Sequence, residues 1–239
     1  MLEAVTFDFW NTVMWEEPGS LREQRLEVWP EALGDDTIDL AALAEAHDAA
    51  HQAYEDSWRA GHQFTVVHAA ALIADRLPGP PENAEALLVE GFCEAGRRAD
   101  VHPSEGVRAC LEELRASGIR LGIVCDIGLT PAHVVRELLD REGLLALFDD
   151  TAFSDEVGHY KPDRRIFEHS LANLGGVAPG RATHVGDRRR TDVAGAQAIG
   201  MSAVRYNRVY DDFAEGPEAE HVIDDLRHLP AVLGVGATA

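Results

Sequence analysis

Apolar residues recur along the chain in short runs that predict buried β-strands. The first run begins at Leu2 and continues through Phe7, where Asp8 follows. Continuous apolar runs of this length are typical of strands that are buried on both faces of a parallel sheet. Later runs with the same character are Ile119–Cys125, Phe148–Phe153, Ala182–Gly186, Met201–Arg205 and His221–Ile223.

Helical patterns separate these strands in the second half of the chain. Ser104 is a predicted N-cap of a helix that continues to about Ser117, and Gly118 ends it. Further helices are predicted at Pro131–Arg141, Pro162–Leu174 and Thr191–Ile199. Strands that alternate with helices predict an α/β fold, in which helices cover both faces of a parallel sheet.

The segment from Met14 to about Asp100 has a different pattern, which predicts helices without strands. One helix, from about Asp39 to Arg59, has an apolar stripe at spacings of three and four residues, as expected of a helix that packs on an apolar surface. The stripe consists of Leu43, His47, Ala50, Tyr54 and Trp58. A second helix is predicted at residues 82–98. We therefore expect a helical module at 14–100, inserted into a core formed by 1–13 and 101–239.

Composition and charge restrict the possible partners. Hydrophobic residues make up 46% of the 239 residues, and the formal net charge is −21. Such an acidic chain is a poor partner for nucleic acid, which requires a basic face. No apolar run approaches the roughly 20 residues that span a bilayer, so we expect no membrane association. Cys93, Cys110 and Cys125 have no paired spacing, which suits a reducing compartment, and we expect a cytoplasmic protein.

Several polar residues follow the predicted strands at positions where they would gather beside Asp8. Open α/β sheets bind ligands at the carboxyl ends of their strands. The residues expected there are Cys125 with Asp126, the loop Tyr160–Asp163, and the segment Gly186–Asp192. That loop contains Lys161, the only lysine in the sequence. Carboxylates and a lysine in this arrangement fit Mg²⁺-assisted phosphoryl transfer, because Mg²⁺ prefers hard oxygen ligands and lysine adds a compact positive charge.

These motifs make the sequence resemble the haloacid dehalogenase superfamily over nearly its whole length. Asp8 matches the nucleophile motif, Cys125 the position of a serine or threonine, Lys161 the third motif, and Asp187 with Asp192 the fourth. The resemblance implies a Rossmann-like core with an α-helical cap at 14–100. It also implies that Asp8 and Asp187 hold Mg²⁺ together with the backbone carbonyl of Trp10, that Asp192 supports the metal, and that Lys161 neutralises Asp8. Asp8, Lys161 and Cys125 are the catalytic residues that the resemblance implies.

Two departures from the superfamily pattern bear on turnover. Phosphatases that the sequence resembles have a second aspartate two residues after the nucleophile, where this chain has Trp10. An indole donates a hydrogen bond but transfers no proton near neutral pH. Cys125 replaces a hydroxyl that would bond the phosphoryl group, and Asp126 replaces the more usual asparagine. Trp10, Asp126 and Arg188 are predicted to contact substrate.

The sequence allows two roles for each of two further groups of side chains. Arg188–Arg190 is the only basic run near the predicted site, and it either contacts a substrate phosphate or forms a solvated loop. His47 and His51 stand one helical turn apart, but no acidic residue or third histidine is evident as a further ligand. They are therefore expected to pack, or to face a substrate, rather than to bind a metal.

The leading hypothesis is a Mg²⁺-dependent phosphatase for a small phosphorylated metabolite, acting as a monomer or homodimer. A 2-haloacid dehalogenase is the main alternative, because such enzymes lack the second aspartate and have an aromatic residue at the Trp10 position. Gly186-Asp187 favours the phosphatase, since the resemblance implies serine-asparagine there in dehalogenases. A non-catalytic protein with the same fold is the third possibility. The resemblance also includes phosphonate-cleaving enzymes, which use a lysine of the cap to form a Schiff base. That class is disfavoured, because residues 14–100 contain no lysine.

Overall fold

The computed structural model describes residues 1–34 and 39–235. The chain divides into two compact units. We call the first the sheet unit, which comprises Met1–Trp15, His102–Asp126 and Leu139–Ala239. The second is the helical unit, which comprises Glu16–Val101 and Ile127–Leu138. No sequence pattern indicates that 127–138 groups with the helical unit.

The sheet unit contains a six-stranded parallel sheet, as the alternation of strands and helices predicts. The strand order is β5-β4-β1-β6-β7-β8, so β1 lies near the centre between β4 and β6. Phe7, the last residue of β1, pairs with Ile123 of β4 and with Val185 of β6. The strands are β1 (Ala4–Phe7), β4 (Arg120–Cys125), β5 (Asp150–Phe153), β6 (Ala182–Gly186), β7 (Ser202–Tyr206) and β8 (His221–Ile223).

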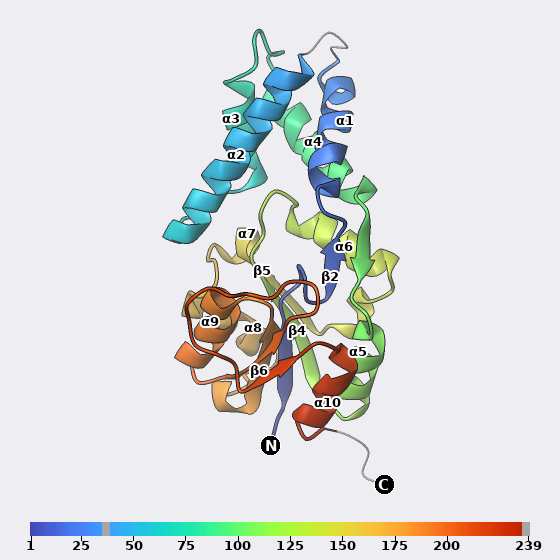
Figure 1. Ribbon diagram of the computed structural model, residues 1–239, viewed down its shortest axis with the longest axis vertical. Helices are drawn as coiled ribbons and strands as arrows, with labels where there is room; N and C mark the ends of the chain where they lie inside the picture. Colours follow the sequence, from blue (N-terminus) through green and yellow to red (C-terminus); the bar gives the residue numbers. More distant parts are fainter. Residues whose placement is uncertain (35–38, 236–239) are drawn as a thin grey trace. The chain divides into compact units, whose positions relative to one another are not determined.

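Helices cover both faces of this sheet, which confirms the predicted fold class. Figure 1 shows α8 (Arg164–Asn173) and α9 (Ala194–Ala198) on one face, with α5 (Val107–Ala116) and α10 (Leu229–Val232) on the other. Side chains of α8 and α9 pack on small residues of the sheet, including Ala4. The other helical segments after β4 are α6 (Ala132–Arg141), η1 (Leu145–Leu147), α7 (Ser154–Val157), η2 (Pro179–Arg181), the π-helical turn η3 (Arg189–Val193) and η4 (Leu226–His228).

The helical unit contains four main helices around its own apolar core. They are α1 (Ser20–Leu33), α2 (Leu40–Ala60), α3 (Val66–Ala74) and α4 (Ala84–Arg98). Trp29, Leu88 and Phe92 are fully buried in this core. The predicted stripe of α2 is buried over its first half, at Leu43, His47 and Ala50, and half-buried at Tyr54 and Trp58. None of the helices in the described residues combines the length and the apolar character needed to cross a bilayer.

The prediction that residues from Met14 to Asp100 contain no strand is wrong at its beginning. Met14–Glu16 forms β2, which pairs with β3 (Val101–Pro103) in a two-stranded sheet. A three-residue strand is too short to show an alternating pattern, and its partner lies more than 80 residues away along the chain. Sequence periodicity therefore could not reveal this pair.

Candidate active site

Asp8 lies at the carboxyl end of β1, directly after a fully buried strand. Its backbone N–H donates to the carbonyl oxygen of Val185, 2.8 Å away, at the end of β6. Asn11 then takes a left-handed backbone conformation, with φ of 61°, which asparagine adopts more readily than most residues. The strand and this turn fix the position of the Asp8 side chain, and the residue is only 6% exposed.

Lys161 places its ammonium group between two carboxylates. Nζ lies 2.6 Å from Oδ1 of Asp8 and 2.6 Å from Oδ1 of Asp192. The backbone N–H of Lys161 donates to Oδ1 of Asp126, at 2.8 Å, which anchors the loop that holds it. Burial opposes the charge, but the carboxylates of Asp192 and Asp8 raise the pKa of Lys161 well above its ordinary value. The ammonium charge is thus shared by two protein carboxylates.

Asp192 is fixed by three hydrogen bonds. In addition to Lys161, Nε2 of His184 donates to its Oδ1 at 3.2 Å, and the backbone N–H of Arg188 donates to its Oδ2 at 2.8 Å. Burial opposes ionisation of this carboxyl, but Lys161 and His184 hold its pKa well below the usual range. Asp192 is therefore an ionised carboxylate with a single orientation.

Asp187 is also buried, but its carboxylate is much less well compensated. The side-chain amide of Asn11 donates to its Oδ2 over 3.5 Å, which is a long and weak hydrogen bond. Burial, together with the charges of Asp8 and Asp192, raises the pKa of Asp187 well above its ordinary value. Burial likewise raises the pKa of Asp8, although Lys161 opposes that shift. Asp8 therefore shares one ammonium group with Asp192, and Asp187 is stabilised only by the weaker effects of Arg188 and Lys161 on its pKa.

The three carboxylates form a cluster that suits a divalent cation. One oxygen atom each from Asp8, Asp187 and Asp192 lies within 4.8 Å of the others, and in residues 1–34 and 39–235 this is the group with metal-ligand spacing. Buried charges that share one ammonium are costly unless a further cation compensates them. A hard ion such as Mg²⁺ matches these oxygen ligands, and its charge would favour the ionised forms of Asp8 and Asp187.

A buried histidine supports this cluster from inside the sheet. His184 lies on β6, is 0% exposed, and packs edge-on against Phe167 with ring centroids 5.1 Å apart. Its Nε2 faces Asp192, so Nε2 carries the proton, and Nδ1 accepts a hydrogen bond from the hydroxyl of Thr6 at 2.9 Å. Burial lowers the pKa of His184, although Asp192 opposes the shift, so the ring is neutral. A chain of hydrogen bonds thus runs from Thr6 through His184 and Asp192 to Lys161.

Two of the predicted residues lie beside Asp8. Trp10 is half-buried, and its ring packs edge-on against Phe9 with centroids 4.7 Å apart. Cys125 ends β4 and is 1% exposed, and its thiol donates to the carbonyl oxygen of Asp126 at 3.4 Å. Burial and the charge of Asp8 raise the pKa of the Cys125 thiol well above its ordinary value. The thiol therefore stays protonated and is available as a weak hydrogen-bond donor.

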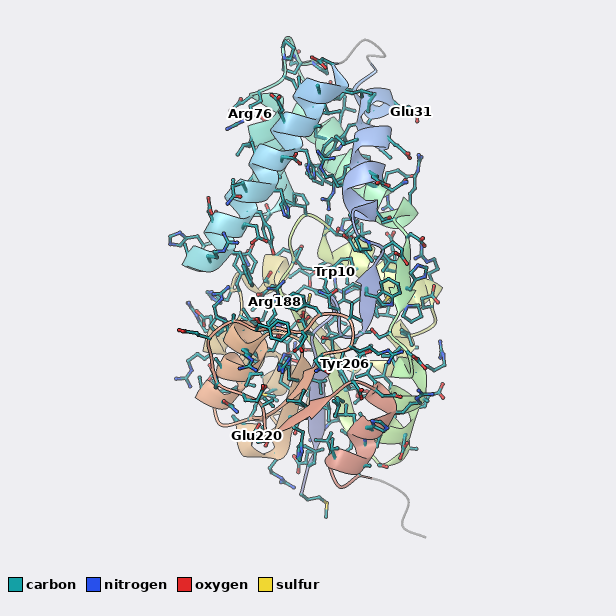
Figure 2. The ribbon with its side chains drawn as sticks, in the orientation of Figure 1. Trp10, Glu31, Arg76, Arg188, Tyr206 and Glu220 are labelled. Atoms are coloured by element: carbon teal, nitrogen blue, oxygen red, sulfur yellow. The ribbon has the colours of Figure 1, made fainter. Side chains whose placement is uncertain are left out.

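The predicted basic run divides into residues with different surroundings. Arg188 is half-buried, and its guanidinium carbon lies 5.0 Å from the centre of the Tyr210 ring. Arg189 instead pairs with Glu218, with Nη2 2.6 Å from Oε2. Figure 2 shows Arg188 and Trp10 at the carboxyl edge of the sheet. Arg188 therefore contacts an aromatic ring, whereas Arg189 forms an ion pair.

Comparison with known proteins identifies the family. A family model described as a haloacid dehalogenase-like hydrolase matches residues 2–200. This chain belongs to the haloacid dehalogenase-like hydrolases. The resemblance predicted from the sequence motifs is confirmed, and the chain is therefore a hydrolase.

Members of this family with different activities resemble the chain. A glyceraldehyde 3-phosphate phosphatase from Methanothermobacter thermautotrophicus is 35% identical over 139 residues, which is 56% of this chain and 59% of that enzyme. The match thus spans less than two thirds of that relative's length. A phosphoserine phosphatase from Thermus thermophilus is 32% identical over 210 residues, or 87% of this chain and 79% of the relative. A 2-haloacid dehalogenase structure from Pseudomonas syringae pv. Tomato DC3000 has a TM-score of 0.73 at 25% identity, covering 98% of this chain and 99% of its own.

Sequence reasoning missed three residues that contact the site in this haloacid dehalogenase-like hydrolase. His184 is predicted only as part of a strand, although it is a titratable residue in a run that is otherwise uncharged. Asn11 follows Trp10 in the turn after the nucleophile position. Tyr210 lies in the segment after β7, where no motif marks it. All three are recognisable only when the strands are placed side by side.

Proposed function

We propose that this protein is a cytoplasmic, Mg²⁺-dependent phosphatase that hydrolyses a small phosphorylated metabolite through an aspartyl-phosphate on Asp8. The observation that carries the proposal is the cluster of three buried carboxylates, two of which bond the same ammonium group. The phosphatase activities named for the Methanothermobacter and Thermus relatives support it. Three free, buried cysteines are compatible with a reducing compartment.

The metal ligands in this proposal are the side chains of Asp8 and Asp187 and the backbone carbonyl of Trp10. Asp192 supports the site through the bonds that fix it to Lys161 and His184. When bound, Mg²⁺ would offset the repulsion between the Asp8 carboxylate and an incoming phosphate. The raised pKa values of Asp8 and Asp187 support this assignment, because a bound cation would stabilise the ionised forms of both carboxyl groups.

Asp8 acts as the nucleophile. One carboxylate oxygen attacks phosphorus and forms a new P–O bond, while the bond from phosphorus to the leaving oxygen breaks. Water then attacks phosphorus, which releases inorganic phosphate and regenerates the carboxylate. This covalent route replaces one difficult displacement by two easier ones. Lys161, whose Nζ lies 2.6 Å from Oδ1 of Asp8, stabilises negative charge near the transferring group, and the protonated Cys125 thiol donates a weak hydrogen bond.

The leaving group restricts the substrates. Trp10 stands where the related phosphatases have an aspartate that protonates the leaving oxygen, and indole cannot replace that function. General acid catalysis contributes roughly 10²–10⁴ in rate. We therefore propose that substrates with good leaving groups, such as acyl phosphates, are hydrolysed faster than simple alkyl esters. Asp126 and a histidine from residues 14–100 are the candidates for an alternative proton donor.

Residues 14–100 are proposed to act as an α-helical cap that contributes to substrate choice, and residues 1–13 and 101–239 as the catalytic core. The packing within the helical unit supports a separate module, because its four helices share their own apolar core. The protein is proposed to act on a small molecule as a monomer or homodimer.

A 2-haloacid dehalogenase is the second candidate, and two observations favour it. Trp10 is aromatic at the position where the second aspartate is missing, and the Pseudomonas dehalogenase shares the fold. In that reaction Asp8 attacks carbon and halide leaves without a proton. The buried carboxylate of Asp187 weighs against this candidate, because halide displacement has no need of a metal ligand there.

A paired substrate screen tests the proposal. Aryl, alkyl and acyl phosphates and 2-haloacids are each incubated with the protein in Mg²⁺ or in chelator, with Asp8→Asn as the control. We expect phosphate release that requires Mg²⁺ and Asp8. Halide release that chelator does not affect would replace the phosphatase by the dehalogenase. Mg²⁺ binding without turnover of any substrate would favour a non-catalytic protein.

A further inference from the structure

Arg188 is held in a defined position beside the carboxylate cluster. Its backbone N–H is fixed on Asp192, and its guanidinium carbon lies 5.0 Å from the centre of the Tyr210 ring. Cation–π contact over this distance restrains the guanidinium group. The positive charge of Arg188 acts on the carboxyl groups of Asp187, Asp192 and Asp8, so this restrained charge lies near the proposed metal ligands.

The segment that supplies Tyr210 is itself tied down. Asp212, only 5% exposed, accepts from the backbone N–H of Arg189 at 2.8 Å. Glu218 pairs with Arg189 at 2.6 Å and with the buried Arg205 at 2.9 Å. These bonds fix the residues that follow Tyr210 to the end of β6 and to β7. The aromatic ring is therefore a stable support for the guanidinium.

Arg188 adds positive charge where an anionic substrate would need it. The ammonium of Lys161 is shared by Asp8 and Asp192, at 2.6 Å from each. The chain has a net charge of −21, so an anionic substrate is repelled except where local positive charge offsets this. Arg188 supplies such a charge in addition to Lys161 and a bound cation. Arginine also offers a planar fork of donors that matches carboxylate or phosphate oxygens.

The strand order separates Arg188 from the point of phosphoryl transfer. Asp8 follows β1, Arg188 follows β6 and Tyr210 follows β7, in the spatial order β1-β6-β7. The guanidinium of Arg188 is held on the ring of Tyr210, on the side of β6 that faces away from β1 and Asp8 in the strand order. The geometry fits a second anionic group better than the transferring phosphoryl group.

We propose that Arg188, positioned by Tyr210, selects phosphorylated substrates that carry a second anionic group, either a carboxylate or a further phosphate. This inference rests on the proposed phosphatase function and specifies its substrate class. Arg188 is the specificity-determining residue, and Tyr210 is a positioning residue that acts through it. Phosphate monoesters whose organic part is uncharged lack the second anionic group that Arg188 would bind.

The test compares two substrates that differ in one group. 3-Phosphoglycerate has a carboxylate where glycerol 3-phosphate has a hydroxymethyl group. We expect the wild-type protein to prefer 3-phosphoglycerate. Arg188→Met should lower kcat/KM for 3-phosphoglycerate about 10- to 100-fold, mainly through KM, since a charge-assisted hydrogen bond is lost. The loss for glycerol 3-phosphate should be at least about threefold smaller than the loss for 3-phosphoglycerate, and thermal denaturation checks that the variant is folded.

Variants of Tyr210 test the positioning role. Tyr210→Leu should raise KM for 3-phosphoglycerate, and Tyr210→Phe should retain the wild-type KM because it keeps the aromatic ring. Equal losses on both substrates in Arg188→Met, or no wild-type preference for the diacid, would overturn the inference and leave the phosphatase intact. Failure to hydrolyse any phosphate ester or acyl phosphate with Mg²⁺ would overturn the proposed function, and this inference with it.

Discussion

A Cβ atom on Gly186 would lie 2.3 Å from Cγ of Asp192, well inside any permitted contact. Asp192 cannot move aside easily, because Lys161, His184 and the backbone of Arg188 all bond to its carboxylate. The absence of a side chain at Gly186 is thus what allows Asp192 to reach Lys161. The glycine of the Gly186-Asp187 motif is required by packing of the acidic cluster.

Gly186→Ala should therefore displace Asp192 and impair the site. We expect kcat/KM on a phosphate substrate to fall about 100-fold, as for other displacements near 1 Å in catalytic groups. Overpacking should also lower the free energy of unfolding by about 1–3 kcal/mol. Steady-state kinetics and chemical denaturation measure the two effects.

Gly180→Ala is the matched control for this substitution. Its added Cβ would meet the carbonyl oxygen of Gly200 at 3.9 Å, an ordinary contact, and the backbone conformation there suits alanine. This variant should retain wild-type activity. A Gly186→Ala protein with unchanged kinetics would show that the fixed orientation of Asp192 is unimportant.

Asp187→Asn tests whether burial of the Asp187 carboxylate destabilises the protein when no metal is bound. The folded-state pKa of Asp187 is raised above that of an unfolded chain, near 3.9, so its contribution to stability is lost as pH rises through the folded-state value. Without metal at pH 7.5, the asparagine variant should be more stable than wild type by about 1–3 kcal/mol. When Mg²⁺ is present at 100 times its Kd, the free energy of unfolding of the wild type should increase by about 2.7 kcal/mol, and that of the variant should increase little.

Thermal denaturation in chelator and in Mg²⁺, for both proteins, makes this measurement. Calorimetric titration gives the Mg²⁺ affinities directly. A variant that is less stable than wild type without metal, or that binds Mg²⁺ equally well, would remove Asp187 from the proposed metal site.

His47 should make the helical unit sensitive to acid. Its Nδ1 faces Asp48 at 2.9 Å, while Nε2 faces the guanidinium of buried Arg25 at 3.3 Å, so Nε2 must accept and the ring is neutral. Burial lowers the pKa of His47 to about 4, although the hydrogen bond to Asp48 opposes the shift. Since the folded-state pKa lies below the ordinary 6.5, the stability it contributes is present above pH 6.5 and is lost as pH falls toward 4.

His47→Gln keeps an acceptor for Arg25 but cannot be protonated. Between pH 6.5 and 4 the wild type should lose up to about 3 kcal/mol more stability than this variant. Denaturant unfolding at several pH values checks the difference. His51→Gln, at an exposed position on the same helix, is the control and should follow the wild type. Parallel pH curves for wild type and His47→Gln would contradict the buried neutral histidine.

Trp10→Asp asks whether Trp10 merely removes a general acid. The new carboxylate would stand where leaving oxygen and water need a proton carrier, so hydrolysis of ordinary phosphate esters should increase. An alkyl ester should gain more than an aryl ester, because its leaving group depends more on protonation. Asp8→Asn in the same background should abolish the gain. Equal gains on both esters, or none, would indicate that Trp10 has another role.

The sequence alone predicted that four charged residues would lie together, because parallel strands bring the residues after them to one edge of the sheet. Asp8, Lys161 and the two aspartates after Gly186 all follow predicted strands, and parallel strands bring their carboxyl ends to one edge. The same patterns predicted α5, α8 and α9, but not the four-residue helices α7 and α10. Local sequence patterns were sufficient wherever strand direction alone determined which residues met.

Contacts that depend on strand order or on side-chain packing were beyond the sequence. Thr6 and His184 meet because β1 pairs with β6, and no pattern along the chain reveals that pairing. Arg188 and Tyr210 meet because the segment after β7 turns back toward β6, which required the tertiary bonds of Asp212. The sequence predicts substrate contact for Asp126, whose carboxylate also accepts from the backbone of Lys161.

The proposed mechanism depends most on Asp8 becoming phosphorylated, and acid-quench trapping tests this directly. The protein is mixed with acetyl phosphate, with Mg²⁺ or with chelator, quenched in acid within milliseconds to seconds, digested, and mapped by mass spectrometry. We predict a phosphoryl group on the peptide that contains Asp8, only when Mg²⁺ is present, and none in Asp8→Asn. Phosphate release with Mg²⁺ but no adduct on Asp8, or an adduct on another residue, would contradict the proposed mechanism.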